Sequence, residues 1–306
     1  MDRAVLRIAL AIASALAFVA GCSLLVDAGG LSTASESGSP DGSSTGVDGG
    51  NNGSNDGSSS PPDDDGGGSD GNVDANTFVP DGTCPKDAGA PMARITDTNG
   101  TFCIDKTEVT NRQLNAFIAS SSRPSAPGAC SFKSSYGGAM RPDDDMPATL
   151  VDWCDAWMYC KWAGKRLCGS RNGTAIADVA PANDAKISEW FAACSKSGMQ
   201  QYPYGGSFNA TACNGCQRTG NCNDGGSPLL AVGSLASCEG GYAGVFDLSG
   251  NVAEWEDNCD SQSICPPRGG TAAVGGADLT CAMGDLPNIN KRNEKGERVG
   301  IRCCAD

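Results

Sequence analysis

The chain has 306 residues and a formal net charge of −14, and it contains 17 cysteines but no histidine. The lack of histidine excludes Ser-His-Asp and Cys-His catalysis, two-His iron sites and the common zinc sites that need imidazole. Most of the negative charge lies in residues 22–83 and says little about the ligand of the remaining chain, and nothing in the sequence suggests a nucleic-acid partner, which requires a basic face.

The first 21 residues have the pattern of a secretory signal peptide. Two arginines precede an apolar run that ends at Ala20 and is too short to cross a bilayer. The run closes on Gly21-Cys22, which resembles the lipobox of bacterial lipoproteins, where the signal is removed and the cysteine carries the lipid. We therefore predict a lipoprotein signal at residues 1–21 and lipidation of Cys22; ordinary cleavage after small residues is the alternative.

Residues 22–83 are predicted to be a disordered linker. Gly, Ser, Asn and Asp dominate this segment, and it holds eleven acidic residues without a single Lys or Arg. Such a segment cannot bury enough apolar surface to offset its chain entropy. The linker would hold a folded domain, residues 84–306, away from a membrane. Ser23 follows the lipidated cysteine, and by the lipoprotein resemblance this favours the cell envelope, at the outer membrane.

The folded domain is expected to begin near Cys84. Its first predicted element is a short strand over 102–105, where apolar residues flank a cysteine. A helix is predicted over 112–120, because its apolar residues recur at i, i+3 and i+4. Either Thr110 or Asn111 can cap its first turn.

Two further helices follow in the chain. Asp152 is the predicted N-cap of the first, whose tryptophan-rich face is expected to lie in the core and which Gly164 should stop. Ser188 is the predicted N-cap of the second, which we expect to end at Gly198. A loop rich in Gly, Asn and Cys separates this helix from the next strong signal.

Sixteen cysteines fall between Cys84 and Cys304. An even number in an exported domain predicts a disulfide framework. Cys213, Cys216 and Cys222 lie close together, so a zinc knuckle and a redox pair are the alternatives to structural disulfides there. The absence of histidine and the expected oxidising compartment favour disulfides.

The segment from Val245 to Trp255 is the strongest single signal. Its centre, Ser249-Gly250-Asn251, is favourable for a tight turn. Asp247 and Glu254 flank this turn, and carboxylates with nearby backbone carbonyls are the hard oxygen ligands that Ca²⁺ takes. The alternative is a core turn whose acids face solvent.

Six short motifs, taken in order, resemble the formylglycine-generating enzyme (sulfatase-modifying factor) superfamily. They are 102–111, 153–167, 202–205, 245–255, 268–271 and 299–303. The chain departs from the family pattern at Cys168-Gly169, where the family has Pro-Thr. The resemblance implies a compact α+β fold related to C-type lectins, low in regular secondary structure and rich in disulfides.

The resemblance also implies structural calcium. One site would use the Asp247 and Glu254 side chains, and a second would use loop residues further upstream. The implied ligands are Asp247, Gly250, Val252 and Glu254 for the first site, and Asn214, Gly215, Asp224 and Gly226 for the second. The family's disulfide pattern carries over as Cys160 with Cys303 and Cys194 with Cys281.

Enzymes of this family use copper, held by two cysteines that follow a Gly-Gly-Ser motif. Residues 272–280, the matching span, contain no cysteine, and Cys281 matches a structural cysteine instead. Copper is therefore not expected, since thiolates are the ligands that select Cu(I). We predict a calcium-stabilised, non-catalytic binding module that meets a glycan, peptide or envelope protein; the alternative is a formylglycine-generating oxidase that acts on a protein cysteine.

Overall fold

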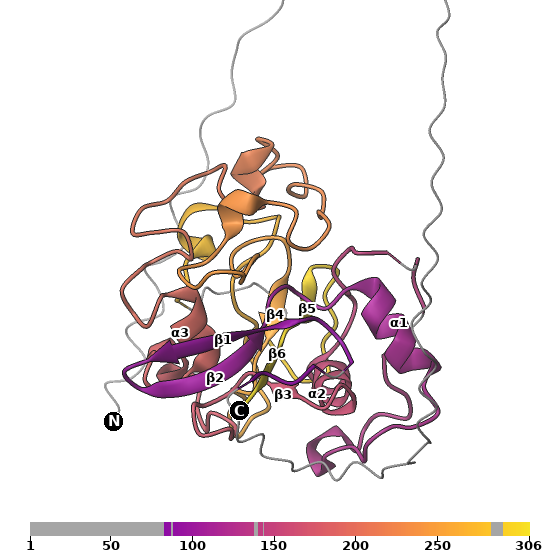
Figure 1. Ribbon diagram of the computed structural model, residues 1–306. Helices are drawn as coiled ribbons and strands as arrows, with labels where there is room; N and C mark the ends of the chain where they lie inside the picture. Colours follow the sequence, from indigo (N-terminus) through magenta and orange to yellow (C-terminus); the bar gives the residue numbers. More distant parts are fainter. Residues whose placement is uncertain (1–82, 87, 138–139, 143, 283–289) are drawn as a thin grey trace, which may run out of the picture. The chain divides into compact units, whose positions relative to one another are not determined.

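The structure is a computed structural model that describes residues 83–86, 88–137, 140–142, 144–282 and 290–306 (Figure 1). The predicted signal peptide, Cys22 and the predicted linker up to residue 82 lie outside the described residues. Within the described ranges, no helix has both the length and the apolar character needed to span a membrane.

A small antiparallel sheet starts the domain. β1 (Met92–Asp97) and β2 (Gly100–Asp105) form a hairpin in which Met92 lies opposite Asp105 and Asp97 opposite Gly100. β6 (Cys303–Ala305) pairs with β2, and β3 (Arg166–Leu167) pairs with β6, so the strand order is β1-β2-β6-β3. The predicted strand at 102–105 is confirmed as part of β2. The C-terminal strand thus lies inside this sheet rather than at its edge.

A second, shorter sheet holds the predicted turn. β4 (Ala253–Trp255) runs parallel to β5 (Val299–Ile301), and all residues of both strands are buried. Only Arg302 separates β5 from β6 in the sequence, so this residue lies at the junction of the two sheets.

α1 (Asn111–Ala119) confirms the predicted helix, one residue earlier than expected, and its N-cap is Thr110 rather than Asn111. The Thr110 side chain accepts a hydrogen bond from the backbone N–H of Gln113, and the Gln113 side chain accepts one from the backbone N–H of Thr110. This capping box satisfies two N–H groups that have no partner within the helix. Leu114 and Phe117 are buried on the inner face of the helix.

α2 (Trp153–Trp162) is capped by Asp152, which also confirms the prediction. Asp152 and Asp155 form a capping box at its amino end. Lys133 donates hydrogen bonds to both carboxylates at 2.6 Å, which neutralises charge that burial would otherwise penalise. Tyr159 on the inner face meets Phe117 of α1 edge to face, with ring centroids 6.0 Å apart.

α3 (Glu189–Cys194) has the predicted N-cap, since the Ser188 hydroxyl accepts a hydrogen bond from the N–H of Phe191. Its predicted end at Gly198 is wrong, because the helix stops at Cys194. Lys196 and Ser197 take left-handed backbone angles, with φ of 50° and 56°, and so cannot continue a right-handed helix. The Ser195 hydroxyl, which donates to the Phe191 carbonyl, occupies one of the last helical acceptors.

Much of the remaining described chain is irregular, apart from short 3-10 helices. These are η1 (Gly128–Cys130), η2 (Ala180–Asn183), η3 (Cys216–Arg218), η4 (Ala236–Cys238) and η5 (Gly276–Leu279). Two groups of buried side chains form the core, one around α1 and α2 and one between the first hairpin and α3.

All sixteen cysteines from Cys84 to Cys304 are joined in disulfides. The pairs are Cys84–Cys103, Cys130–Cys154, Cys160–Cys303, Cys168–Cys304, Cys194–Cys281, Cys213–Cys238, Cys216–Cys222 and Cys259–Cys265. The two pairings that the family resemblance implied are among them. The cysteines of the suggested zinc knuckle instead form two separate disulfides.

Candidate functional site

The turn that follows Val245 reverses direction through left-handed backbone angles. Asp247, Gly250 and Asn251 have φ of 61°, 74° and 53°. A Cβ added at Gly250 would lie 2.5 Å from the carbonyl oxygen of Asn214, so this position accepts only glycine. The Asn251 N–H donates to the same carbonyl at 2.9 Å, which fixes the turn against the loop that contains Asn214.

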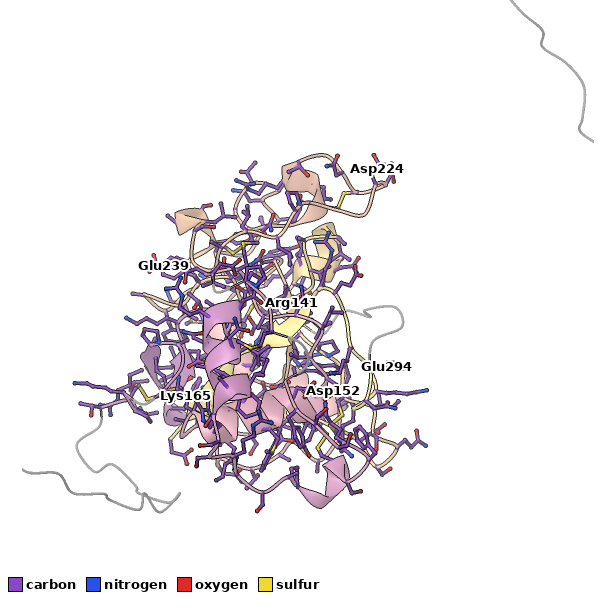
Figure 2. The ribbon with its side chains drawn as sticks, turned by 90° about the vertical axis from the view of Figure 1, so that its right-hand side faces the viewer. Arg141, Asp152, Lys165, Asp224, Glu239 and Glu294 are labelled. Atoms are coloured by element: carbon purple, nitrogen blue, oxygen red, sulfur yellow. A yellow bond between two sulfur atoms is a disulfide. The ribbon has the colours of Figure 1, made fainter. Side chains whose placement is uncertain are left out.

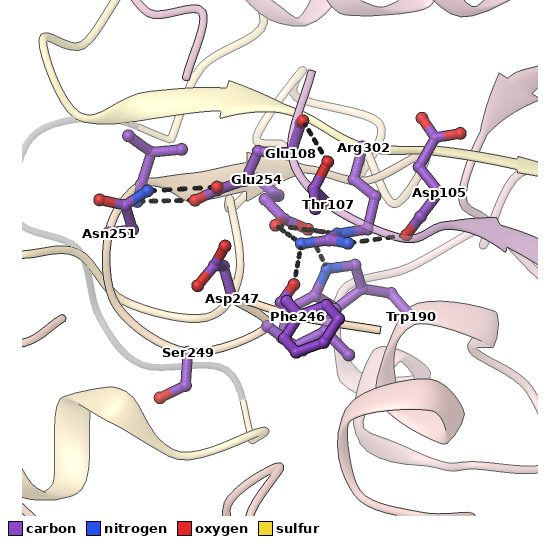
Figure 3. Close-up of polar contacts among 12 residues, drawn as sticks. Asp105, Thr107, Glu108, Trp190, Phe246, Asp247, Ser249, Asn251, Glu254 and Arg302 are labelled. Atoms are coloured by element: carbon purple, nitrogen blue, oxygen red, sulfur yellow. Dashed lines mark hydrogen bonds and ion pairs between the residues drawn. The ribbon is translucent and has the colours of Figure 1, made fainter. Parts of the chain in front are cut away.

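Glu254, at the centre of β4, is paired with a buried arginine rather than facing solvent. The Arg302 Nε donates to both carboxylate oxygens at 2.9 and 2.8 Å, and its Nη2 donates to Oε1 at 2.8 Å. The indole Nε1 of Trp190 donates to Oε2 at 2.6 Å. Figure 3 shows this group of contacts. Both oxygens of Glu254 therefore already have partners.

Arg302 also binds two backbone carbonyls. Its Nη1 donates to the Asp105 carbonyl and its Nη2 to the Phe246 carbonyl, each at 2.7 Å (Figure 3). One guanidinium thus connects the end of β2, the start of the turn and β4. A planar group with five fixed donors suits this task better than lysine would.

Two more carboxylates surround this pair. Glu108 is fully buried and accepts hydrogen bonds at 3.2 Å from the Val252 N–H and from the Asn251 side-chain amide. Asp247 is 4% exposed and accepts from the Gly233 N–H. We call Glu108, Asp247 and Glu254 the acidic cluster.

The acidic cluster carries more negative charge than one arginine can balance. Burial raises the pKa of Glu108 well above its usual range, and the charges of Asp247 and Glu254 raise this pKa further. Burial also raises the pKa of Asp247 to about 6, although the Gly233 N–H and the Arg302 charge act to lower it. The electrostatic environment therefore favours a bound cation or protonation of these groups.

The first predicted calcium set is drawn from this turn alone. Asp247, Glu254 and the carbonyls of Gly250 and Val252 all belong to one segment of eight residues. Within the described chain, no three His, Cys, Asp or Glu residues are positioned to share a metal ion. An ion at this turn would therefore rely on the two carbonyls as well as on carboxylates, which calcium accepts.

The second predicted set is only partly assembled. Asn214 is buried, and its side-chain Oδ1 has no hydrogen-bond partner, so this oxygen is free to act as a ligand. The Gly215 carbonyl, by contrast, accepts from the Ser227 hydroxyl at 2.8 Å. Asp224 is exposed at the tip of its loop (Figure 2), and no hydrogen bond among the described residues joins it to Asn214. Gly226 lies in the same loop.

No site role was predicted from the sequence for Glu108, Arg302 or Trp190. Glu108 and Arg302 each lie in a motif that was recognised only as a family signature. A signal was present for Arg302, because a charged residue between Ile301 and Cys303 interrupts an otherwise apolar C-terminal segment. A charge in such a place needs a buried partner.

The segment that matches the copper-binding span of the enzymes is packed against its neighbours through its backbone. The N–H of Ala272 donates to the Asn251 carbonyl at 2.9 Å, and its carbonyl accepts from Ser227 at 2.8 Å. The Val274 carbonyl accepts from Cys216 at 2.9 Å. These contacts give the segment a structural role between two loops.

Comparison with known proteins agrees with this architecture. The family model of the sulfatase-modifying factor enzyme 1-like domain matches residues 67–306. The chain belongs to this family. Its fold is accordingly the α+β fold of the family, in which short helices and strands are connected by many disulfides.

Two curated relatives each match 55% of the chain. The inactive C-alpha-formylglycine-generating enzyme 2 of Mus musculus is 29% identical over 184 residues, which cover 55% of this chain and 52% of that protein. The protein of the same name from Bos taurus is also 29% identical over 184 residues, covering 55% of this chain and 53% of its own length. The chain thus spans about half the length of these relatives.

Solved structures show more distant likeness. PvdO from Pseudomonas aeruginosa has a TM-score of 0.45 at 17% identity, covering 72% of this chain and 90% of its own. Treponema denticola variable protein 1 has a TM-score of 0.41 at 17% identity, covering 71% and 92% respectively.

The close approach at Gly250 leads to a direct prediction. Gly250→Ala should destabilise the domain by about 2 kcal/mol or more, because the new Cβ meets a backbone oxygen and the φ is left-handed. The control is Gly206→Ala, where an added Cβ meets nothing within 4 Å. Thermal unfolding of the two variants should separate them clearly, and equal melting temperatures would contradict the described turn.

Proposed function

We propose that the chain is a non-catalytic binding module of the sulfatase-modifying factor type, stabilised by calcium and carried on a lipid tether. The observation that supports the lack of catalysis best is the state of the cysteines. Every cysteine between Cys84 and Cys304 is in a disulfide, so none is left as a thiolate that would hold copper.

The cysteines nearest the copper-equivalent segment each have a structural partner. Cys281 is joined to Cys194, and Cys265, on the amino-terminal side of the segment, is joined to Cys259. The adjacent residues Cys303 and Cys304 are bound to two different partners, so this vicinal pair leaves no free thiol. The names of the two curated relatives, which describe those proteins as inactive, are consistent with this proposal.

Calcium is the cation that we propose for the turn at Asp247. The donors there are carboxylate and carbonyl oxygens, which are hard ligands. The excess negative charge of the acidic cluster supports a bound divalent cation, which would relieve the repulsion between Glu108 and Asp247. Asp247, Gly250, Val252 and Glu254 would hold this ion, and the free Oδ1 of Asn214 is the best-supported member of the second set.

The tether is proposed from the sequence at the amino terminus. Cys22 would carry the lipid, and residues 22–83 would allow the domain to meet partners at a distance from the outer membrane. Cys22→Ser in the full-length chain should release the protein into the aqueous phase or leave the precursor uncleaved. Unchanged partition into the detergent phase would contradict the lipid anchor.

Calcium binding should appear as a gain in stability. An ion that binds only the folded domain stabilises it by about 3 kcal/mol at a hundredfold excess over the dissociation constant. We expect the melting temperature to rise in calcium and to fall in chelator, and Asp247→Asn should abolish most of this difference. Asp178→Asn, a change at an exposed carboxylate outside both predicted calcium sets, is the matched control and should keep this difference. A wild-type melting curve that chelator does not move would contradict the calcium proposal.

The lack of oxidase activity is tested by offering the missing metal and a substrate. The purified chain is loaded with Cu(I) under conditions that keep the disulfides intact and is then given a cysteine-containing peptide in air. We expect neither stoichiometric copper binding nor a peptide of formylglycine mass. Appearance of both would favour the alternative, a formylglycine-generating oxidase.

A further inference from the structure

An uncharged loop, partly exposed and partly buried, follows α3. Residues 197–217 contain no Asp, Glu, Lys or Arg, although 19% of the whole chain is charged. The same stretch holds two tyrosines and a phenylalanine within seven residues, and its other side chains are mainly amides, hydroxyls and small residues. Asn214 and Cys216, near the end of this stretch, contact the turn at Asn251 and the segment that contains Val274, whereas residues 199–211 take no part in the contacts described above.

Three rings in this loop gather into one group. Tyr202 and Tyr204 are stacked, with ring centroids 5.4 Å apart and planes 13° apart. Phe208 contacts Tyr202 at a centroid distance of 5.8 Å. Tyr202 is 4% exposed and forms the base of the group, whereas Phe208 is 36% exposed and Tyr204 is partly exposed. We call these three residues the aromatic platform.

Hydrogen bonds hold the aromatic platform in place. The Tyr202 hydroxyl donates to the Gly276 carbonyl at 3.3 Å, and the Tyr204 hydroxyl accepts from the Asn209 N–H at 3.4 Å. The Gln201 carbonyl accepts from the Cys281 N–H at 2.9 Å, so the loop runs beside η5 and the Cys194–Cys281 disulfide. The rings are therefore ordered before any ligand arrives, which lowers the entropic cost of binding.

The surroundings of the aromatic platform are open and polar. An added Cβ at Gly205 or Gly206 would meet nothing within 4 Å, so space is free beside Tyr204 in the chain. Ser207, Asn209 and Thr211 are exposed on the same loop and supply hydroxyl and amide groups. Exposed rings flanked by neutral hydrogen-bonding groups form a combination that suits a ligand with both apolar and hydroxyl faces.

We propose that the aromatic platform binds a neutral carbohydrate. The C–H face of a pyranose ring would lie on Tyr204 and Phe208, and its hydroxyls would bond to the neighbouring amide and hydroxyl groups. A charged peptide would lack counter-charges along these 21 residues, and a nucleic acid would lack the basic groups that it needs. This inference rests on the proposed function as a binding module and names the chemical class of its ligand.

The test uses the full-length chain and four neutral hexasaccharides, built from β-linked glucose, α-linked glucose, mannose and N-acetylglucosamine. Binding is measured by calorimetry, with saturation-transfer NMR to identify the sugar protons in contact. We expect at least one saccharide to bind, and Tyr204→Ala and Phe208→Ala to weaken its affinity about tenfold. Tyr204→Phe, which keeps the ring, should bind nearly as well as the wild type.

Phe132→Ala supplies the matched control, because Phe132 is an exposed aromatic, 55% accessible, outside the loop. It should leave affinity unchanged, and so should a rise in salt from roughly 0.05 to roughly 0.5 M, since no charges take part. Failure of all four saccharides to bind, or equal affinity in the Tyr204→Ala and Phe208→Ala variants, would overturn the inference. So would displacement of the saccharide contact by an uncharged apolar peptide that binds more tightly. None of these outcomes bears on the copper test. A failure of the carbohydrate inference can therefore be distinguished from a failure of the proposed non-catalytic function.

Discussion

The buried ion pair between Arg302 and Glu254 is the interaction on which the rest of the domain depends. Removal of two charges from water costs several kcal/mol per ion, and only complete hydrogen bonding offsets this cost. Here the carboxylate is matched by the guanidinium and the Trp190 indole, and the guanidinium also binds the carbonyls of Asp105 and Phe246. Two sheets, a turn and α3 therefore meet at one fully desolvated centre, and their relative positions follow from its geometry.

The disulfides around this centre compensate for a fold with little regular structure. Cys303 and Cys304 follow Arg302 directly, and their disulfides lead to α2 and to the residue after β3. Each closes a loop of more than a hundred residues, which in the entropy model constrains the unfolded chain by about 4–5 kcal/mol. The strands that flank the arginine are only three residues long, so these covalent links hold it in place where the short ladders alone would be weak.

Local chemistry was predictable from the sequence, whereas the pairing of distant charges was not. Asp152 and Ser188 were identified as N-caps, and Thr110 as one of two candidates, because capping depends on residues within one turn. The end of α3 was predicted too late because Lys196 and Ser197 take left-handed backbone angles although neither is a glycine, the residue that usually marks such a position in a sequence. Glu108 and Arg302 lie 194 positions apart, and only the folded chain shows that both approach the turn at Asp247. Of the acidic cluster, therefore, only Asp247 and Glu254 were predicted from the sequence.

A double-mutant cycle on Arg302 and Glu254 tests the central role of this pair most directly. Arg302→Met and Glu254→Gln, each measured in chelator, are expected to destabilise the domain by about 3–5 kcal/mol, since each leaves a buried partner unmatched. The loss of unfolding free energy in the double variant should be at least 2 kcal/mol smaller than the sum of the losses in the two single variants, roughly the coupling found for contacting charges. Additive losses, to within about 0.5 kcal/mol, would show that the two side chains act independently and would contradict the account.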